Sequence, residues 1–161
     1  MVIQDGVRLG DMSDLWDDSM SVGVQAMDDD HRIFLGLISE LRQAKHDPHA
    51  EDSIGTYIDM LSQYADYHLT REENMMAAVN YPDIDDHRGS HEELRRRCRD
   101  FLRRYRHEAD SVDPGELEEF LVEWWMRHIS VEDQAYKPYV AGDATAEEAA
   151  NAVRFPGDPT S

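Results

Sequence analysis

The chain of 161 residues contains a single cysteine, Cys98. One thiol cannot form a disulfide within the chain, and it excludes a thiolate metal cluster built by one molecule. Any metal ion bound here must therefore be held by nitrogen and oxygen donors. Long apolar runs are also missing. None approaches the roughly 18 residues that a membrane-spanning helix needs.

Lysine is scarce as well, because only Lys45 and Lys137 occur and the other basic residues are arginines. With 16 basic against 35 acidic residues, the net charge is −19. Phosphate binding needs a basic face, so this balance argues against a nucleic-acid partner and disfavours an anionic membrane surface. The N-terminal residues MVIQDGVRLGDMSD lack the basic start and the apolar stretch of a secretory signal. We expect a cytoplasmic protein without membrane insertion, and the strong charge favours a monomer.

Four segments of the chain show apolar residues at alternating steps of three and four, which is typical of amphipathic helices. The first has the Asp-Asp-Asp run 28–30 as its expected N-cap, and the second spans about 51–79. The third follows Asn80-Tyr81-Pro82, and the fourth starts at Pro114 behind Asp113. Short connections between such helices predict an all-α fold, an antiparallel up-down-up-down four-helix bundle.

The ends of the chain fall outside this pattern. We expect one domain over residues 1–140, including an N-terminal arm of residues 1–27, and an acidic C-terminal tail over 141–161. The segment Thr145–Val153 is compatible with a short helix, whereas the final FPGDPTS shows no helical period.

On each apolar stripe, metal-binding types of side chain stand where a core hydrophobe is expected. They are His31 on the first helix, His68-x3-Glu72 on the second, His87-x3-His91 on the third and His128-x4-Asp133 on the fourth. Taken singly, each has an ordinary explanation, such as a helix-surface pair, a solvated imidazole or a hydrogen-bonded core histidine. Buried without a partner, however, each group would cost several kcal/mol.

The positions of these residues along their helices also coincide. His31 and His87 lie near helix starts, whereas His68 and His128 lie near helix ends. An antiparallel bundle brings these four positions to one level. Five imidazoles and two carboxylates at one level are enough to hold two transition-metal ions.

Other histidines and the cysteine do not join this set. His46, His49 and His107 lie at helix ends or off the stripes, and we interpret them as surface residues, with a weak adventitious metal site at His46-x2-His49 as the alternative. Cys98 lies about two turns beyond His91 and is expected in the core.

One spacing does not fit a regular α-helix. Asp133 follows His128 by five residues, which is about 140° around an ideal helix. Five residues return to the same face only through a π-type turn, a feature that often marks functional sites. We therefore predict a widened turn, or the end of regular helix, between these two residues.

The motifs together resemble the hemerythrin family, specifically its single-domain bacterial members, over roughly Trp16 to Tyr139. The resemblance is carried by Trp16, Val22-Gly23-Val24, Asp28-x2-His31, His68-x3-Glu72-Glu73, Tyr81-Pro82, His87-x3-His91 and Trp124-x3-His128-Ile129-x3-Asp133-x2-Tyr136. No ligand position of the family pattern is missing. The first dozen residues and the tail after Tyr139 extend beyond a minimal domain of this kind.

This resemblance implies two iron ions joined by an oxo or hydroxo bridge. His87, His91 and His128 would hold one iron, His31 and His68 the other, and Glu72 and Asp133 would bridge them. The iron with only two imidazoles would keep one coordination position open for dioxygen. On the matching turns, the apolar side chains around that position would be Phe34, Leu69, Trp124, Trp125 and Ile129, although each is also explained as plain core.

The leading hypothesis for function is reversible dioxygen binding for transport, storage or delivery. Ferritin-like oxidases use four carboxylates and two histidines, whereas neutral imidazole dominates here, which favours release of dioxygen intact. Sensing of oxygen, nitric oxide or redox state is the alternative. We rank an enzyme lowest, because the expected pocket offers no proton donor. An unidentified protein that receives oxygen would be a further partner.

Overall fold

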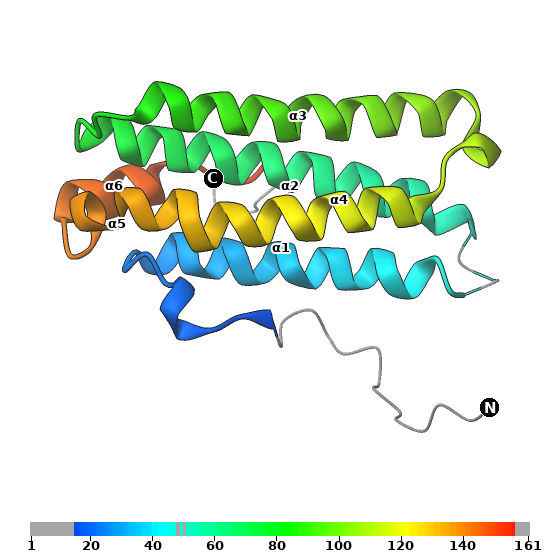
Figure 1. Ribbon diagram of the computed structural model, residues 1–161, viewed down its shortest axis with the longest axis horizontal. Helices are drawn as coiled ribbons and strands as arrows, with labels where there is room; N and C mark the ends of the chain where they lie inside the picture. The colour runs from blue at the N-terminus through cyan, green and yellow to red at the C-terminus, as the bar shows by residue number, and fades with distance from the viewer. Residues whose placement is uncertain (1–14, 48, 50, 157–161) are drawn as a thin grey trace.

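The computed structural model describes residues 15–47, 49 and 51–156 as an antiparallel helical bundle. Its long helices are α1 (Gln25–Ala44), α2 (Glu51–Ala78), α3 (Ile84–His107) and α4 (Pro114–Arg127). Figure 1 shows successive helices running in opposite directions, which confirms the predicted up-down-up-down order. No helix within the described ranges is long and apolar enough to cross a membrane.

Shorter elements complete the chain. Two 3-10 turns, η2 (Asp18–Met20) and η3 (Ala109–Ser111), precede α1 and α4; the π-helical turn η4 (His128–Glu132) follows α4 and leads into α5 (Asp133–Val140) and α6 (Ala144–Ala152). Helix α6 confirms the short helix expected within Thr145–Val153. It lies against α2 and α1 at the end of the bundle where α5 ends. Residues 157–161, the last part of the expected aperiodic FPGDPTS segment, lie outside the described residues.

The helix ends follow the local sequence. Asn80 adopts a left-handed backbone with φ 54°, and the Tyr81 N–H then donates to the Met76 carbonyl at 2.9 Å, which closes α2. At α4, the Asp113 side chain accepts from the Gly115 N–H at 2.8 Å, with Pro114 at the first helical position. Both boundaries agree with the sequence prediction.

The predicted start of the first helix was wrong. Helix α1 begins at Gln25, inside the expected arm, and its capping residue Val24 contributes no side-chain hydrogen bond. Asp28 lies in the first turn of α1, and its side chain accepts a hydrogen bond from the Val22 N–H at 2.9 Å. This bond connects the preceding loop to the helix. Asp28 therefore holds the preceding loop rather than capping the helix, which a capping pattern alone does not reveal.

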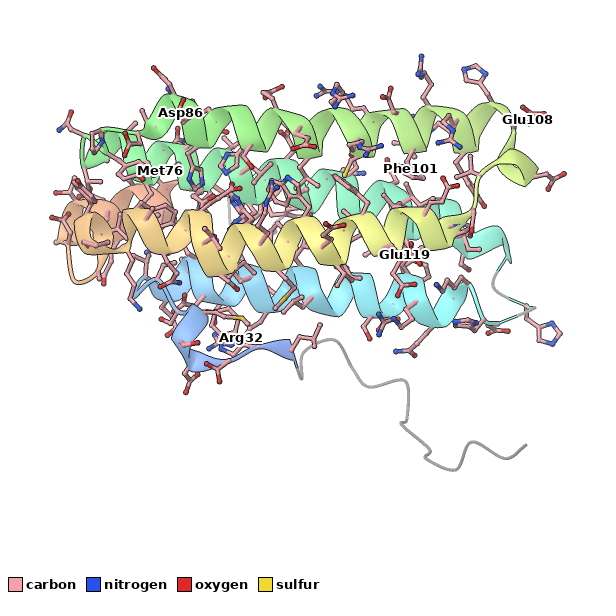
Figure 2. The ribbon with its side chains drawn as sticks, in the orientation of Figure 1. Arg32, Met76, Asp86, Phe101, Glu108 and Glu119 are labelled. Carbon is pink, nitrogen blue, oxygen red and sulfur yellow. The ribbon has the colours of Figure 1, made fainter. Side chains whose placement is uncertain are left out.

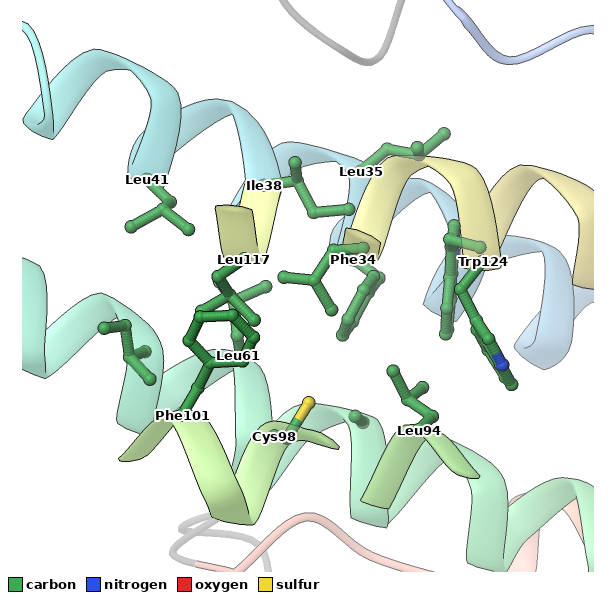
Figure 3. Close-up of a cluster of buried hydrophobic side chains, with 14 of the residues drawn as sticks. Phe34, Leu35, Ile38, Leu41, Leu61, Leu94, Cys98, Phe101, Leu117 and Trp124 are labelled. Atoms are coloured by element: carbon green, nitrogen blue, oxygen red, sulfur yellow. The ribbon is translucent and has the colours of Figure 1, made fainter. Parts of the chain in front are cut away.

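Two hydrophobic clusters fill the bundle, one on each side of the level that holds the predicted metal ligands. The larger includes Ile38, Leu61, Cys98, Phe101 and Trp125 among its buried side chains, and Figure 3 shows Cys98 between Phe101 and Leu94. The smaller gathers side chains from the segment before α1, from α1, α2, the α2–α3 loop, α5 and α6: Val22, Val24, Met27, Met75, Met76, Tyr81, Tyr136, Val140, Ala146 and Ala150. Figure 2 places Met76 near the α5 end and Phe101 far along the bundle from it.

Gly23 allows the arm to pack closely against the end of α5. Its φ of +77° lies in the left-handed region, and a Cβ added there would stand 2.8 Å from the Ala141 Cβ. We predict that Gly23→Ala lowers the free energy of unfolding by at least about 1–2 kcal/mol, the cost of the backbone conformation alone.

The matched control is Gly36→Ala in α1, where an added Cβ meets nothing within 4 Å. In this variant the free energy of unfolding should rise by about 0.5–1 kcal/mol, because alanine is the better helix former. Urea unfolding of both variants makes the comparison, and equal stability of the Gly23 variant and the unaltered chain would contradict the packing argument.

Candidate metal centre

The seven predicted side chains lie together between the two hydrophobic clusters. Helix α1 contributes one of them, α2 and α3 two each, and the η4–α5 junction the last two; they are His31, His68, Glu72, His87, His91, His128 and Asp133. His87 is 7% exposed and the other six are fully buried. His87 also lines a surface cavity of about 370 Å³ together with Val131 and Glu132, so solvent approaches the group from this side.

The π-helical turn η4 brings the last two residues onto one face. Its widened backbone spans His128–Glu132, and the Asp133 N–H donates to the His128 carbonyl five residues earlier. As a result, an oxygen of Asp133 lies 3.1 Å from His128 Nε2. The widened turn predicted from the five-residue spacing is confirmed.

Three imidazoles converge on one oxygen of Glu72. Its Oε2 lies 3.4 Å from His87 Nε2, 3.0 Å from His91 Nε2 and 3.3 Å from His128 Nε2. The possible ligand atoms of these four residues all lie within 4.8 Å of one another. This spacing suits a single metal ion between them.

Two further imidazoles form a second group with the same glutamate. The rings of His31 and His68 are 4.8 Å apart, and the possible ligand atoms of His31, His68 and Glu72 again lie within 4.8 Å. Asp133 spans both groups, because its Oδ2 is 3.1 Å from His31 Nε2 and its Oδ1 is 3.5 Å from His87 Nε2. Both carboxylates therefore lie where they could bridge two metal ions.

Several polar atoms at this level have no hydrogen-bond partner within the described residues. They are both ring nitrogens of His31, Nε2 of His68 and both carboxylate oxygens of Asp133. A buried polar atom without a partner typically costs about 1–3 kcal/mol. Cations bound between these atoms would satisfy them, so the donor set fits an imidazole–carboxylate metal site.

Carboxylates behind the rings orient three of the imidazoles. Glu73 lies 2.8 Å from His91 Nδ1, and Glu132 lies 2.8 Å from His128 Nδ1. Asp30 lies 3.3 Å from His68 Nδ1. Such contacts favour a proton on Nδ1 and leave Nε2 free to face the metal position.

The orienting carboxylates were not identified from the sequence. Glu132 stands four residues after His128, a spacing that could have indicated the contact. Glu73 adjoins a predicted ligand and belongs to the motifs of the family resemblance. Asp30 carries no such signal, because its contact with His68 depends on the packing of α1 against α2.

Burial and nearby charges shift the pKa values of several side chains in the metal-free site. Burial lowers the pKa of His31 to about 4. Burial also opposes charge on His128, but Asp133 and hydrogen bonds to Glu132 and Glu72 outweigh it and raise its pKa to about 10. Burial and the nearby Glu72 raise the pKa of Asp133 to about 7. Without metal, the site therefore holds protons at neutral pH.

The side chains predicted to form an apolar pocket are all buried in the larger cluster. Trp125 stacks on Phe34 at 3.9 Å, and its ring lies 5.1 Å from His68 and 5.8 Å from His31. Trp124 instead stacks on His128 at 4.4 Å, on the side of the three-imidazole group. Trp16, which the pocket prediction omitted, lies 6.1 Å from His31.

Leu69 and Ile129, the remaining two of the predicted pocket, are fully buried in the same cluster. Which of the five side chains surround an open coordination position stays a prediction. His46, His49 and His107 are exposed, as expected. Cys98 is buried, and burial raises the pKa of its thiol to about 12, which leaves it unreactive.

We predict that metal binding at neutral pH releases protons, because coordination needs deprotonated imidazole and carboxylate. Lowering the pH adds protons that compete for the same atoms, so the affinity for the metal should fall. Zn²⁺ serves as a redox-inert probe, and a pH indicator in weakly buffered solution measures the release. Mg²⁺, which prefers oxygen ligands, is the control, and Zn²⁺ binding without proton release would contradict the site.

The family model described as "Hemerythrin HHE cation binding domain" matches residues 22–140. A bacteriohemerythrin of Stenotrophomonas maltophilia is 29% identical over 126 residues, 78% of this chain and 80% of that protein. A bacteriohemerythrin of Ralstonia nicotianae is 26% identical over 137 residues, 84% of this chain and 96% of that protein.

Solved structures agree at the level of the fold. A crystal structure of wild-type hemerythrin is similar with a TM-score of 0.73 and 23% identity, covering 79% of this chain and 97% of that one. The family model covers well over half of the present chain, and the matched region contains all seven clustered side chains. The chain therefore belongs to the hemerythrin family.

Proposed function

We propose that this protein binds dioxygen reversibly at a centre of two iron ions, for transport, storage or delivery of oxygen. The observation that carries the proposal is the unequal division of imidazoles around two shared carboxylates. His87, His91 and His128 form one group, and His31 and His68 the other. A metal ion with one ligand fewer than its neighbour has room for a small molecule.

The seven residues would hold the metal in named roles. His87, His91 and His128 would bind one iron, His31 and His68 the other, and Glu72 and Asp133 would bridge them. Two ferrous ions held by these residues would supply the electrons for a reversible reaction with dioxygen. With five neutral imidazoles and two carboxylates, the donor set carries less negative charge than the four-carboxylate sites of di-iron oxidases, which favours return of dioxygen unchanged.

The chain's own residues also restrict water and movement at the site. Tyr136 donates a hydrogen bond to Glu72 Oε1, which leaves Oε2 directed at the three imidazoles. Trp125 and Phe34 cover the His31–His68 side with apolar surface. A dry environment there would disfavour the loss of charged oxygen species and oxidation of the metal. These features support oxygen carriage over an enzymatic reaction.

We predict that the number of iron ions bound per chain falls in a residue-specific way. Glu72 belongs to both groups, so Glu72→Ala should lose both ions. His31→Ala removes a ligand of one group only, so this variant should retain about one ion. Metal analysis after anaerobic loading measures the iron content of both variants. The surface substitution His107→Ala is the control and should keep two iron ions per chain. Loss of both ions from the His31 variant would argue against two separate groups.

Reversible oxygen binding has a spectroscopic test. When oxygen is admitted to the reduced, iron-loaded protein, visible absorption bands should appear, and they should vanish on deoxygenation over repeated cycles. Immediate oxidation to a stable ferric form without an oxygenated spectrum would exclude reversible carriage. That outcome would favour redox sensing or peroxide chemistry at the same centre.

A further inference from the structure

Asp30 is a buried carboxylate that contacts a proposed iron ligand. It is only 3% exposed, and its Oδ2 lies 3.3 Å from His68 Nδ1. The Tyr64 hydroxyl donates to its other oxygen at 2.9 Å. A buried carboxylate needs a compensating charge, and Arg71 supplies it.

Arg71 fixes the position of Asp30 from the same helix as His68. Its Nη1 atom donates to both oxygens of Asp30, at 2.9 and 3.0 Å. The side chain of Arg71 is 11% exposed, so water screens this ion pair weakly. The three residues form a chain of contacts from the arginine to the imidazole.

Helix α6 holds the other side of the same guanidinium. Arg71 Nε donates to the backbone carbonyl of Ala150, which is fully buried. Beyond α6, the Phe155 ring packs 5.7 Å from Tyr64 and 5.3 Å from Tyr67. The family match ends at residue 140, so these contacts come from a segment outside it.

We propose that Arg71 is a positioning residue for the iron ligand His68, and that docking of α6 holds Arg71 in place. The C-terminal segment thereby sets how tightly the two-imidazole iron is bound. This inference rests on the proposed di-iron function. The physical route is orientation: Asp30 keeps the Nδ1 proton of His68 and turns Nε2 to the metal, and such contacts typically contribute about 10- to 100-fold to metal affinity.

The three-imidazole group contains a comparable arrangement without α6. Glu73 orients His91, and Arg95 donates to the same Glu73 oxygen at 2.8 Å. The side chain of Arg95 is 12% exposed, close to the value for Arg71. Arg95 is held by ion pairs with Asp66 and Glu92, whereas Arg71 is held by the C-terminal helix. Each arginine should therefore affect a different iron, which provides a matched internal control.

The experiment follows iron release from the reduced, loaded protein into a ferrous chelator. Two kinetic phases are expected, and His31→Ala, which keeps only the three-imidazole iron, identifies which phase belongs to that ion. Arg71→Met should accelerate the phase of the two-imidazole iron by about 10- to 100-fold and leave the other unchanged. Arg95→Met should do the reverse.

The role of α6 is tested by disturbing its docking. Ala150→Arg places a charged side chain at a fully buried position, and it should accelerate the same phase as Arg71→Met. Glu148→Arg, on the exposed face of α6, should change neither phase. If the Ala150 variant does not fold, Asp143→Ala removes the N-cap bond to the Ala146 N–H and should give a smaller effect in the same direction.

The outcomes separate this inference from the proposed function. Failure of the unaltered protein to bind two irons would overturn both. Two bound irons whose release is unaffected by Arg71→Met, or accelerated equally in both phases, would overturn the positioning role alone. A selective effect of Arg71→Met without any effect of Ala150→Arg or Asp143→Ala would overturn the part assigned to α6.

Discussion

The shared position of Glu72 is the constraint on which the rest of the centre depends. One carboxylate reaches both groups of imidazoles only if α2 lies in register with α1, α3 and the η4–α5 segment. Burial opposes its charge, yet hydrogen bonds from His128, His87 and His91 hold the pKa of Glu72 well below its usual range. The charged form of Glu72 is thus favoured at the level where the two groups of imidazoles meet, and both groups face the same carboxylate.

The sequence predicted the parts of this centre that depend on helical periodicity. Step sizes of three and four placed His68, Glu72, His87 and His91 on buried faces, and the misfit between His128 and Asp133 predicted the π-helical turn. The antiparallel order predicted that these residues lie at one level, because it aligns helix starts with helix ends.

Asp30 and the Ala150 carbonyl escaped prediction because they depend on contacts between distant segments. Asp30 was assigned to a helix cap because a run of aspartates has that local meaning, but its contacts are with His68 and Arg71 on another helix. The family resemblance stops before α6, so it offered no guide to the Ala150 carbonyl. Local pattern and family likeness both lack the information that tertiary packing supplies.

The division of the interior into two hydrophobic clusters has a consequence for folding. A layer of buried imidazoles and carboxylates separates the cluster around Trp125 from the cluster around Met76. Apolar packing therefore does not run unbroken from one end of the bundle to the other, and metal ions would supply the missing cohesion at the junction. We expect the metal-loaded bundle to unfold as one cooperative unit, whereas without metal the end around Met76 should open at a lower denaturant concentration than the end around Trp125.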